Sequence, residues 1–196
     1  MGTPFNGDFH IEKAIKKLCR RFRVATIIET GTFRGDTTPV LAKYASVVHT
    51  VEVNTDFFAT LNFAEPNIIK HRGSSPDVLR AILGKVKKPC LFYLDAHWDN
   101  YWPLMDELKA IAYRAKNSVL VIHDFLNPEQ PGYGYDTYNG QALCFEYISG
   151  VLSSIYPSGY SFHYNSKADG LRRGVIYIYP KTLIIDKNTG FAAVDR

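Results

Sequence analysis

Short apolar runs alternate with amphipathic stretches over residues 1–123, and this alternation constrains the fold more than any other feature of the chain. The runs are brief and rich in β-branched residues, as buried strands are. They lie at 24–29, 47–53, 68–69, 90–94 and 118–122. The helices expected around them lie at about 36–44, at 55–63, from 75 onward and at 101–115. Alternation with short connections predicts a parallel sheet that carries helices on both faces.

Both ends of the chain add elements to this core. Apolar residues recur at helical spacing before residue 23, with basic residues opposite them, which predicts an amphipathic helix. The elements expected after Asp124 are a loop at 127–139, a helix at 141–155, and two antiparallel strands at 160–164 and 174–179. The expected organisation is one domain over 1–196, made of the N-terminal helix at 1–23, the core at 24–180 and a C-terminal tail at 181–196.

The composition argues against several classes of protein. No apolar run approaches the length of a membrane span. The three cysteines are far apart and odd in number, which argues against a disulfide framework or a cysteine zinc site. No secretory signal is visible at the start, so a cytoplasmic location is expected. The net charge of +4 is too small to indicate nucleic acid, and the basic residues of the first helix are best explained as its solvated face.

The turn after the first expected strand and the acid after the second point to a nucleoside site. In an open parallel sheet, ligands bind at the carboxyl ends of the strands. Gly31 and Gly35 allow the chain to turn sharply and a ligand to approach the backbone. The turn lacks the G-x-G-x-x-G pattern of nicotinamide-binding proteins. Glu52 follows about twenty residues later, where its carboxylate can accept hydrogen bonds from two ribose hydroxyls.

Glu29, Gly31 and Gly35, followed by Glu52, resemble the pattern of class I S-adenosylmethionine-dependent methyltransferases. The resemblance covers residues 10 to about 180. It implies a doubly wound, Rossmann-like α/β sheet of seven strands, mostly parallel with an antiparallel last strand, and S-adenosylmethionine as cofactor. The cofactor-binding residues that it implies are Glu29, Gly31, Thr32, Gly35, Glu52, Ser74 and Asp95.

Two further strand ends carry the residues expected to do chemistry. Asp95 and His97 follow the fourth strand, and His123 and Asp124 follow the fifth, so these side chains are expected to converge. Methyl transfer to a hydroxyl needs an aligned nucleophile and a group that removes its proton. We expect His97 to be the base, Asp95 to lie beside the transferred methyl group, and Asp124 to be the partner of His97 or a metal ligand.

This stretch, with Pro103 to Leu108 on the next helix, resembles the macrocin-type sugar O-methyltransferases. Those enzymes often carry acids at the positions of His97 and His123, and some of these acids hold magnesium. The two histidines leave two alternatives open. Either no metal is present, or a divalent metal is held by Asp95, His123 and Asp124, whose mixed ligands suit Mn, Fe, Zn or Ni better than magnesium.

The acceptor is expected to bind aromatic side chains on the same rim, namely Trp98, Tyr133 and Tyr135. The predicted function is methyl transfer from S-adenosylmethionine to a hydroxyl of a small molecule, a sugar or a glycan. Two other functions stay open: a metal-dependent tailoring enzyme of another class on the same fold, and a non-catalytic domain that binds a nucleoside or a partner. The sequence leaves the oligomeric state open.

Overall fold

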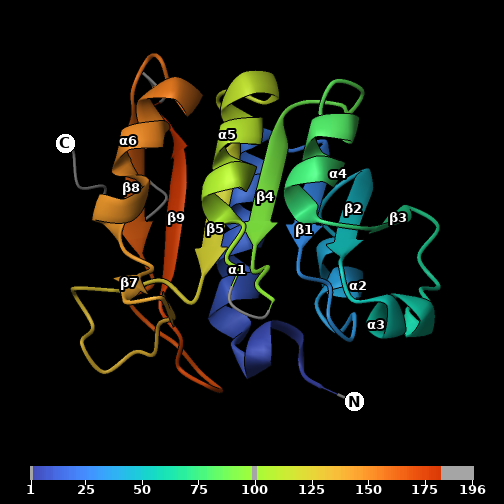
Figure 1. The fold of residues 1–196 in the computed structure, drawn as a ribbon, viewed down its shortest axis with the longest axis horizontal. Helices are drawn as coiled ribbons and strands as arrows, with labels where there is room; N and C mark the ends of the chain where they lie inside the picture. Colours follow the sequence, from blue (N-terminus) through green and yellow to red (C-terminus); the bar gives the residue numbers. More distant parts are fainter. Residues whose placement is uncertain (1, 99–100, 182–196) are drawn as a thin grey trace.

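A computed structural model describes residues 2–98 and 101–181, so of the predicted C-terminal tail all but Lys181 lies outside the described residues. Seven strands form one sheet in the order β3-β2-β1-β4-β5-β9-β8 (Figure 1). They are β1 (Thr26–Thr30), β2 (Val47–Glu52), β3 (Ile68–Arg72), β4 (Cys90–Leu94), β5 (Val119–His123), β8 (Tyr160–Tyr164) and β9 (Val175–Pro180). Strands β1 to β5 pair in parallel, whereas β9 runs antiparallel to both β5 and β8. The predicted sheet, with its antiparallel last strand, is confirmed.

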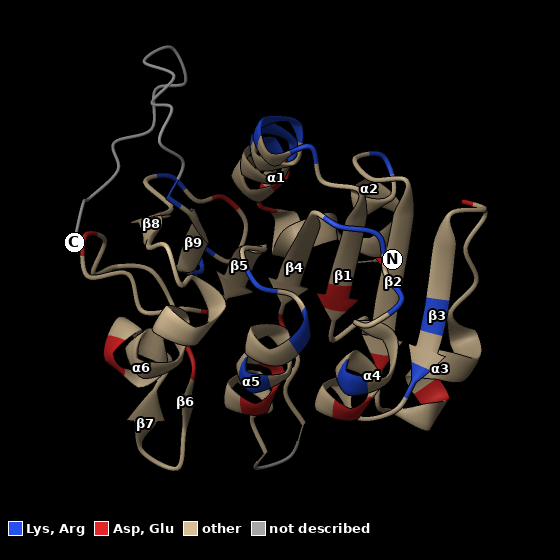
Figure 2. Cartoon of the chain, turned by 90° about the horizontal axis from the view of Figure 1, so that it is seen from above, with Lys and Arg blue, Asp and Glu red and all other residues tan. Residues whose placement is uncertain are grey.

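Helices cover both faces of the sheet (Figures 1 and 2). The helices are η1 (Pro4–Gly7), α1 (Phe9–Phe22), α2 (Thr38–Leu41), α3 (Thr55–Thr60), α4 (Ser75–Ile82), α5 (Leu104–Arg114) and α6 (Phe145–Ile155). Helices α1 and α2 pack on one face, and α4, α5 and α6 pack on the other. Among the described residues, none of these helices combines the length and apolar character that a membrane crossing requires.

Several predicted boundaries differ from the structure. The helix expected at 36–44 is a single turn, because the tight turn after β1 takes up residues before Thr38. The helix expected at 141–155 begins only at Phe145, because a small hairpin of β6 (Thr137–Tyr138) and β7 (Gln141–Ala142) precedes it. The third strand is longer than the predicted 68–69, since its polar residues also pair with β2.

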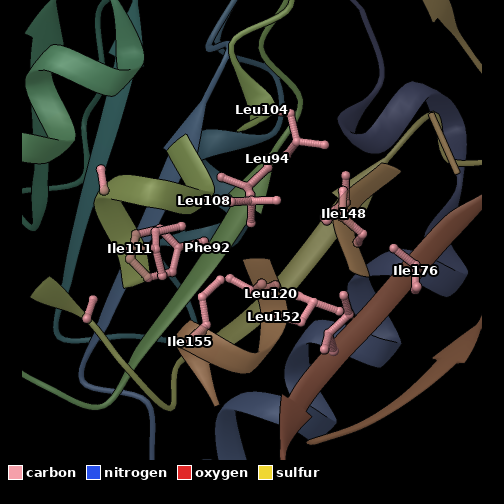
Figure 3. Close-up of a cluster of buried hydrophobic side chains, with 14 of the residues drawn as sticks. Phe92, Leu94, Leu104, Leu108, Ile111, Leu120, Ile148, Leu152, Ile155 and Ile176 are labelled. Carbon is pink, nitrogen blue, oxygen red and sulfur yellow. The ribbon is translucent and has the colours of Figure 1, made fainter. Parts of the chain in front are cut away.

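Alternate residues of each central strand enter different hydrophobic layers, as the two-residue period of a strand requires. Phe92 on β4 joins the cluster under α4, α5 and α6, together with Leu108 on α5 (Figure 3). Its neighbours Leu91 and Tyr93 join the cluster under α1 and α2. Because β4 is buried on both faces, its sequence is continuously apolar rather than alternating.

The strand order reverses between β1 and β4, and the loops after these two strands meet closely at Gly31. This glycine has a φ of +80°, and a Cβ built on it would lie 2.6 Å from the carbonyl oxygen of Asp95. Any other residue would push the two loops apart. Gly31 therefore serves the close approach of two strand ends as well as the turn.

The N-terminal segment lies across this same edge of the sheet. Phe5 is buried against Tyr93, with ring centroids 5.6 Å apart, and its backbone nitrogen donates to Thr37 Oγ1 at 3.0 Å. A Cβ on Gly170, in the loop between β8 and β9, would overlap the carbonyl of Asn6. The segment before α1 and the loop before β9 are thus packed against each other.

Shortening Leu108 to alanine should lower the free energy of unfolding by about 2–5 kcal/mol, because its side chain is fully buried among three helices and the sheet. Urea unfolding followed by circular dichroism measures the loss. Tyr113→Ala on the same helix is the control, since Tyr113 is 76% exposed, and it should cost less than about 1 kcal/mol. Equal losses for the two variants would contradict the assigned face of α5.

Candidate active site

A pocket of about 480 Å³, here called the main pocket, opens at the carboxyl ends of β1, β2, β4 and β5. Six residues expected at the site line it: Gly31, Glu52, Asp95, His97, Trp98 and Asp124. Its other walls come from Asn6, Phe33, Val51, Val53, Asn54, Phe57, Gly73, Ser75 and Ala96. The sheet therefore brings most of the predicted residues together at the point where strand order reverses.

Glu52 is buried, and backbone amides hold both of its carboxylate oxygens. Oε2 accepts a hydrogen bond from the nitrogen of Phe33 at 2.7 Å, and Oε1 accepts one from the nitrogen of Asn54 at 2.7 Å. A carboxylate oxygen has more than one lone-pair direction, so each can accept a further bond from a ligand in the main pocket. The turn after β1 and the loop after β2 thus hold the two carboxylate oxygens of Glu52 in place at the pocket wall.

Glu29 and Thr32 line a second cavity of about 70 Å³, here called the lower cavity, which shares Gly31 and Asp95 with the main pocket. Glu29 Oε2 accepts hydrogen bonds at 2.6 Å from the hydroxyls of Thr38 and Thr50. Burial raises the pKa of Glu29 to about 7, although these two hydrogen bonds oppose the rise. Glu29 and Thr32 therefore lie beside the main pocket rather than in its wall.

Two predicted cofactor residues do not line any described pocket wall. Gly35 closes the turn by donating from its nitrogen to the carbonyl of Thr32 at 2.9 Å, and a Cβ on it would lie 2.9 Å from side-chain atoms of Leu61 and Phe63. Ser74 precedes α4, while its neighbours Gly73 and Ser75 line the main pocket. Gly35 and Ser74 thus lie beside the described pocket walls, and their contact with a cofactor stays a prediction.

His123 lies between two carboxylates at the floor of the site. Its Nδ1 is 3.1 Å from Asp95 Oδ1 and 3.2 Å from Asp124 Oδ1. Burial alone would lower the pKa of His123, but the two carboxylates outweigh it and place that pKa well above its ordinary value. Both carboxylates approach the same imidazole nitrogen, and this favours the protonated form of His123.

Arg173, just before β9, joins the end of β5 to the loop after it. Its Nε donates to Asp124 Oδ1 and its Nη2 donates to Asp136 Oδ1. Burial alone would raise the pKa of Asp124, but His123 and Arg173 outweigh it and lower the pKa to about 2. Asp124 also has a φ of +57°, a backbone conformation that turns the chain out of β5.

The predicted metal ligands Asp95, His123 and Asp124 do come together, with one donor atom of each within 4.8 Å of the others. However, the Oδ1 atom of Asp124 already pairs with both His123 and Arg173. Arg173 competes with a metal ion for this oxygen, whereas the donor atoms of Asp95 and His123 are the kinds that suit a transition metal. The alternatives with and without a metal therefore both stay predictions.

His97 is exposed at the mouth of the main pocket, where its role as a base stays a prediction. The expected pairing of His97 with Asp124 is wrong, because Asp124 is held by His123 and Arg173 instead. The ring nearest to His97 among the described aromatic contacts is Tyr138, with centroids 6.0 Å apart.

Of the three aromatic residues predicted to bind the acceptor, one lines the main pocket and two line no described pocket. Trp98 lines the main pocket. Tyr133 is buried, and its hydroxyl donates to the carbonyl of Ser166 at 3.4 Å, so it holds two loops together. Tyr135 is 41% exposed and lines no described pocket. The contacts of this loop decide the difference between the two tyrosines, and residue type alone does not reveal it.

Tyr138 and its stack are not among the residues that the sequence singled out to bind the acceptor. Tyr138 stacks on Trp102 with centroids 5.4 Å apart, and Trp102 stacks on Tyr147 at 4.6 Å. Tyr138 and Trp102 line a narrow space of about 10 Å³, here called the side pocket, which also borders His97 and Asp136. The Asn139-Gly140 pair after Tyr138 is a hairpin signal that could have located this residue.

Glu107, expected only as part of a helix pattern, is a buried acid of the site. It is 1% exposed, lines the side pocket and accepts a hydrogen bond from Ser75 Oγ. Burial raises the pKa of Glu107 to about 7, and Asp95 adds to the rise, while hydrogen bonds from Ser75 and Thr30 oppose it. The sequence signal for a buried acid was that Glu107 falls on the apolar face of α5, next to Leu104 and Leu108.

No family model matches the sequence, and no curated protein matches it significantly. Solved structures do match its fold. The O-methyltransferase TomG from Streptomyces achromogenes, in complex with S-adenosylmethionine, has 15% identity and a TM-score of 0.59 over 88% of this chain and 80% of its own. The O-methyltransferase from Bacillus cereus, in complex with S-adenosylhomocysteine, has 16% identity and a TM-score of 0.55 over 88% and 81%.

A third structure has the same architecture with a different name. The precorrin 8W decarboxylase from Methanobacterium thermoautotrophicum has 13% identity and a TM-score of 0.52 over 87% of this chain and 90% of its own. The chain thus has the Rossmann-like fold of class I methyltransferases, confirming the predicted fold class. The fold alone does not decide the reaction.

Replacing Arg173 with methionine should lower the free energy of unfolding by about 1–3 kcal/mol, because it leaves Asp124 and Asp136 without their shared donor. Chemical unfolding at neutral pH measures this change. Lys167→Met removes an exposed cation from the same loop and should change stability by less than about 0.5 kcal/mol. A loss no greater in Arg173→Met than in Lys167→Met would show that the bridge does not stabilise the fold.

The buried Glu107 should make stability fall as pH rises. Its folded pKa of about 7 exceeds the ordinary 4.5, so the folded state retains a proton that the unfolded state has released. Its contribution is complete below pH 4.5 and is lost as the pH rises through about 7. In Glu107→Gln the decline should be shallower by up to about 1.4 kcal/mol per pH unit. Unfolding curves across this range test it, with the exposed Glu129→Gln as control; a slope equal to the parent's in Glu107→Gln would refute it.

Proposed function

We propose that this chain is an S-adenosylmethionine-dependent O-methyltransferase acting on a small molecule. The observation that carries the proposal is Glu52, whose carboxylate is fixed by two backbone amides at the wall of the main pocket. It lies across the pocket from Asp95 and His97, at the place where an open parallel sheet binds its ligand. Solved structures with this fold include O-methyltransferases in complex with S-adenosylmethionine or S-adenosylhomocysteine.

The lining of the main pocket fits this cofactor. Its volume of about 480 Å³ is within the usual range for small-molecule sites. Glu52 would accept the ribose hydroxyls, and the apolar Val53 and Phe57 with Gly73 would hold the adenine. Gly31 and Asp95 would hold the methionine end, next to the lower cavity. When bound, S-adenosylmethionine supplies a methyl group on a positively charged sulfonium.

The chain's own residues position the acceptor and take its proton. His97 is exposed to the pocket, and histidine is the side chain that most readily exchanges a proton near neutral pH. His123 is less suited to this role, because it is buried and its Nδ1 is already paired with Asp95 and Asp124. We therefore assign His97 as the base and the Asp95–His123–Asp124 cluster as the rigid floor beneath the acceptor.

The proposed acceptor is a ring compound with a free hydroxyl, a sugar or a glycan end. Trp98 at the pocket and Tyr138 behind His97 offer flat faces on which such a ring can stack. A metal-dependent reaction is less well supported, because His123 and Arg173 pair with the acids that would hold the ion. Cys19, Cys90 and Cys144 form no disulfide bonds, as is usual for proteins that function in the reducing cytoplasm, the location proposed for this chain.

Calorimetric titration with S-adenosylhomocysteine tests the proposal, with NAD as the control nucleotide. Binding with a dissociation constant in the micromolar range is expected for the parent chain. Glu52→Gln should weaken it at least tenfold, or about 1.4 kcal/mol, because one acceptor oxygen becomes a donor. Asp77→Asn removes an exposed acid from the first turn of α4 and should leave the affinity within twofold.

The same titration after treatment with a chelator tests the metal alternative. Because side-chain cations already compensate the floor, the affinity should remain within twofold of the untreated sample. A folded parent chain that binds no S-adenosylhomocysteine in either condition would overturn the methyltransferase proposal. It would favour a domain that binds a partner instead.

A further inference from the structure

The charges around the acceptor end of the site are strongly one-sided. Among the described residues, no lysine or arginine lines the main pocket or the side pocket. Glu52 lies at the cofactor's end, and four further acids line these pockets: Asp95 and Asp124 border both, and Glu107 and Asp136 border the side pocket. Arg34 borders only the lower cavity, on the cofactor's side of Gly31.

The cations near the floor do not reverse this excess. Arg173 is shared by Asp124 and Asp136, and His123 is shared by Asp95 and Asp124. Three carboxylates therefore share two cations, and the described ion pairs of both cations are with these carboxylates. An anionic group placed above this floor would face carboxylates, and none of the described lining residues is a lysine or arginine that could compensate its charge.

The walls beside the floor are aromatic. Trp98 lines the main pocket, and Tyr138 lies behind His97 in a stack braced by Trp102 and Tyr147. Aromatic faces bind flat rings and also attract cations. A negatively charged floor beside aromatic walls is the combination that recognises an ammonium group on a ring.

We propose that the acceptor is a hydroxylated ring compound that carries an ammonium group, and that this pocket excludes phosphorylated and carboxylated acceptors. The inference rests on the proposed function, because it names the class of molecule bound beside the cofactor. The hydroxyl would lie toward His97, and the ammonium would lie toward Asp124, the carboxylate of the main pocket that the cofactor assignment leaves. The ring itself, phenol or sugar, is left for the binding experiment to distinguish.

Two matched pairs of probes test the charge preference on protein saturated with S-adenosylhomocysteine. Tyramine is compared with 3-(4-hydroxyphenyl)propionate, and glucosamine is compared with glucuronate, by calorimetry at neutral pH and low salt. In at least one pair the ammonium compound should bind at least tenfold more tightly than the carboxylate. The pair that shows the preference tells whether the ring is a phenol or a sugar.

The second measurement repeats the probe titrations on a variant that carries an added positive charge in the pocket wall. His97 is exposed, so His97→Lys and the neutral control His97→Gln should both fold. The lysine should reduce the preference for the ammonium probe at least fivefold, while the glutamine should leave it within twofold. Both readouts are binding constants, so they do not depend on the activity of the variants.

The outcomes separate the two proposals. If S-adenosylhomocysteine binds but the carboxylate probes bind as tightly as the ammonium probes, or if no probe binds, the charge inference is overturned and the proposed function stands. If His97→Lys leaves the preference unchanged, the acids of this pocket are not its source and the inference is again overturned. If the folded parent does not bind S-adenosylhomocysteine at all, the proposed function fails first.

Discussion

The structure depends on the close contact between the loops that follow β1 and β4. Gly31 presses against the backbone of Asp95 and Ala96, which leaves no room for a side chain. This contact fixes the distance between the two loops at the point where the strand order reverses. On one side lie Glu52 and the apolar wall of the main pocket, and on the other lie the residues that we assign to chemistry.

Much of the fold was predictable from the sequence, because buried parallel strands leave an unmistakable pattern. The runs around Phe92 and Leu120 are apolar on both faces, and the chain must connect them through helices. The position of Glu52 and Asp95 in the wall of the main pocket followed from this, because Glu52 ends β2 and Asp95 directly follows β4. Boundaries such as the start of α6 were less predictable, because the small hairpin before it is set by loop contacts.

The acceptor side could not be predicted residue by residue. Tyr133, Tyr135 and Tyr138 are equivalent as residue types, and only the path of the loop decides that Tyr138 faces the site. The partner of Asp124 was equally hidden. Arg173 lies 49 positions away in the sequence, and its pairing depends on how β9 enters the sheet. Long-range ion pairs have no periodic signal, unlike the apolar faces of strands and helices.

The bridge from Arg173 to Asp124 and Asp136 has an evolutionary consequence. Loops on a rigid scaffold usually diversify freely, and this is how related enzymes acquire new substrates. Here the loop that carries Tyr138 is fastened to the floor of the site through the same guanidinium that compensates Asp124. Substitutions in this loop that suit it to a new acceptor must keep Asp136, or must change Asp136 and Arg173 together. Specificity in this lineage is therefore expected to change in coupled steps rather than one residue at a time.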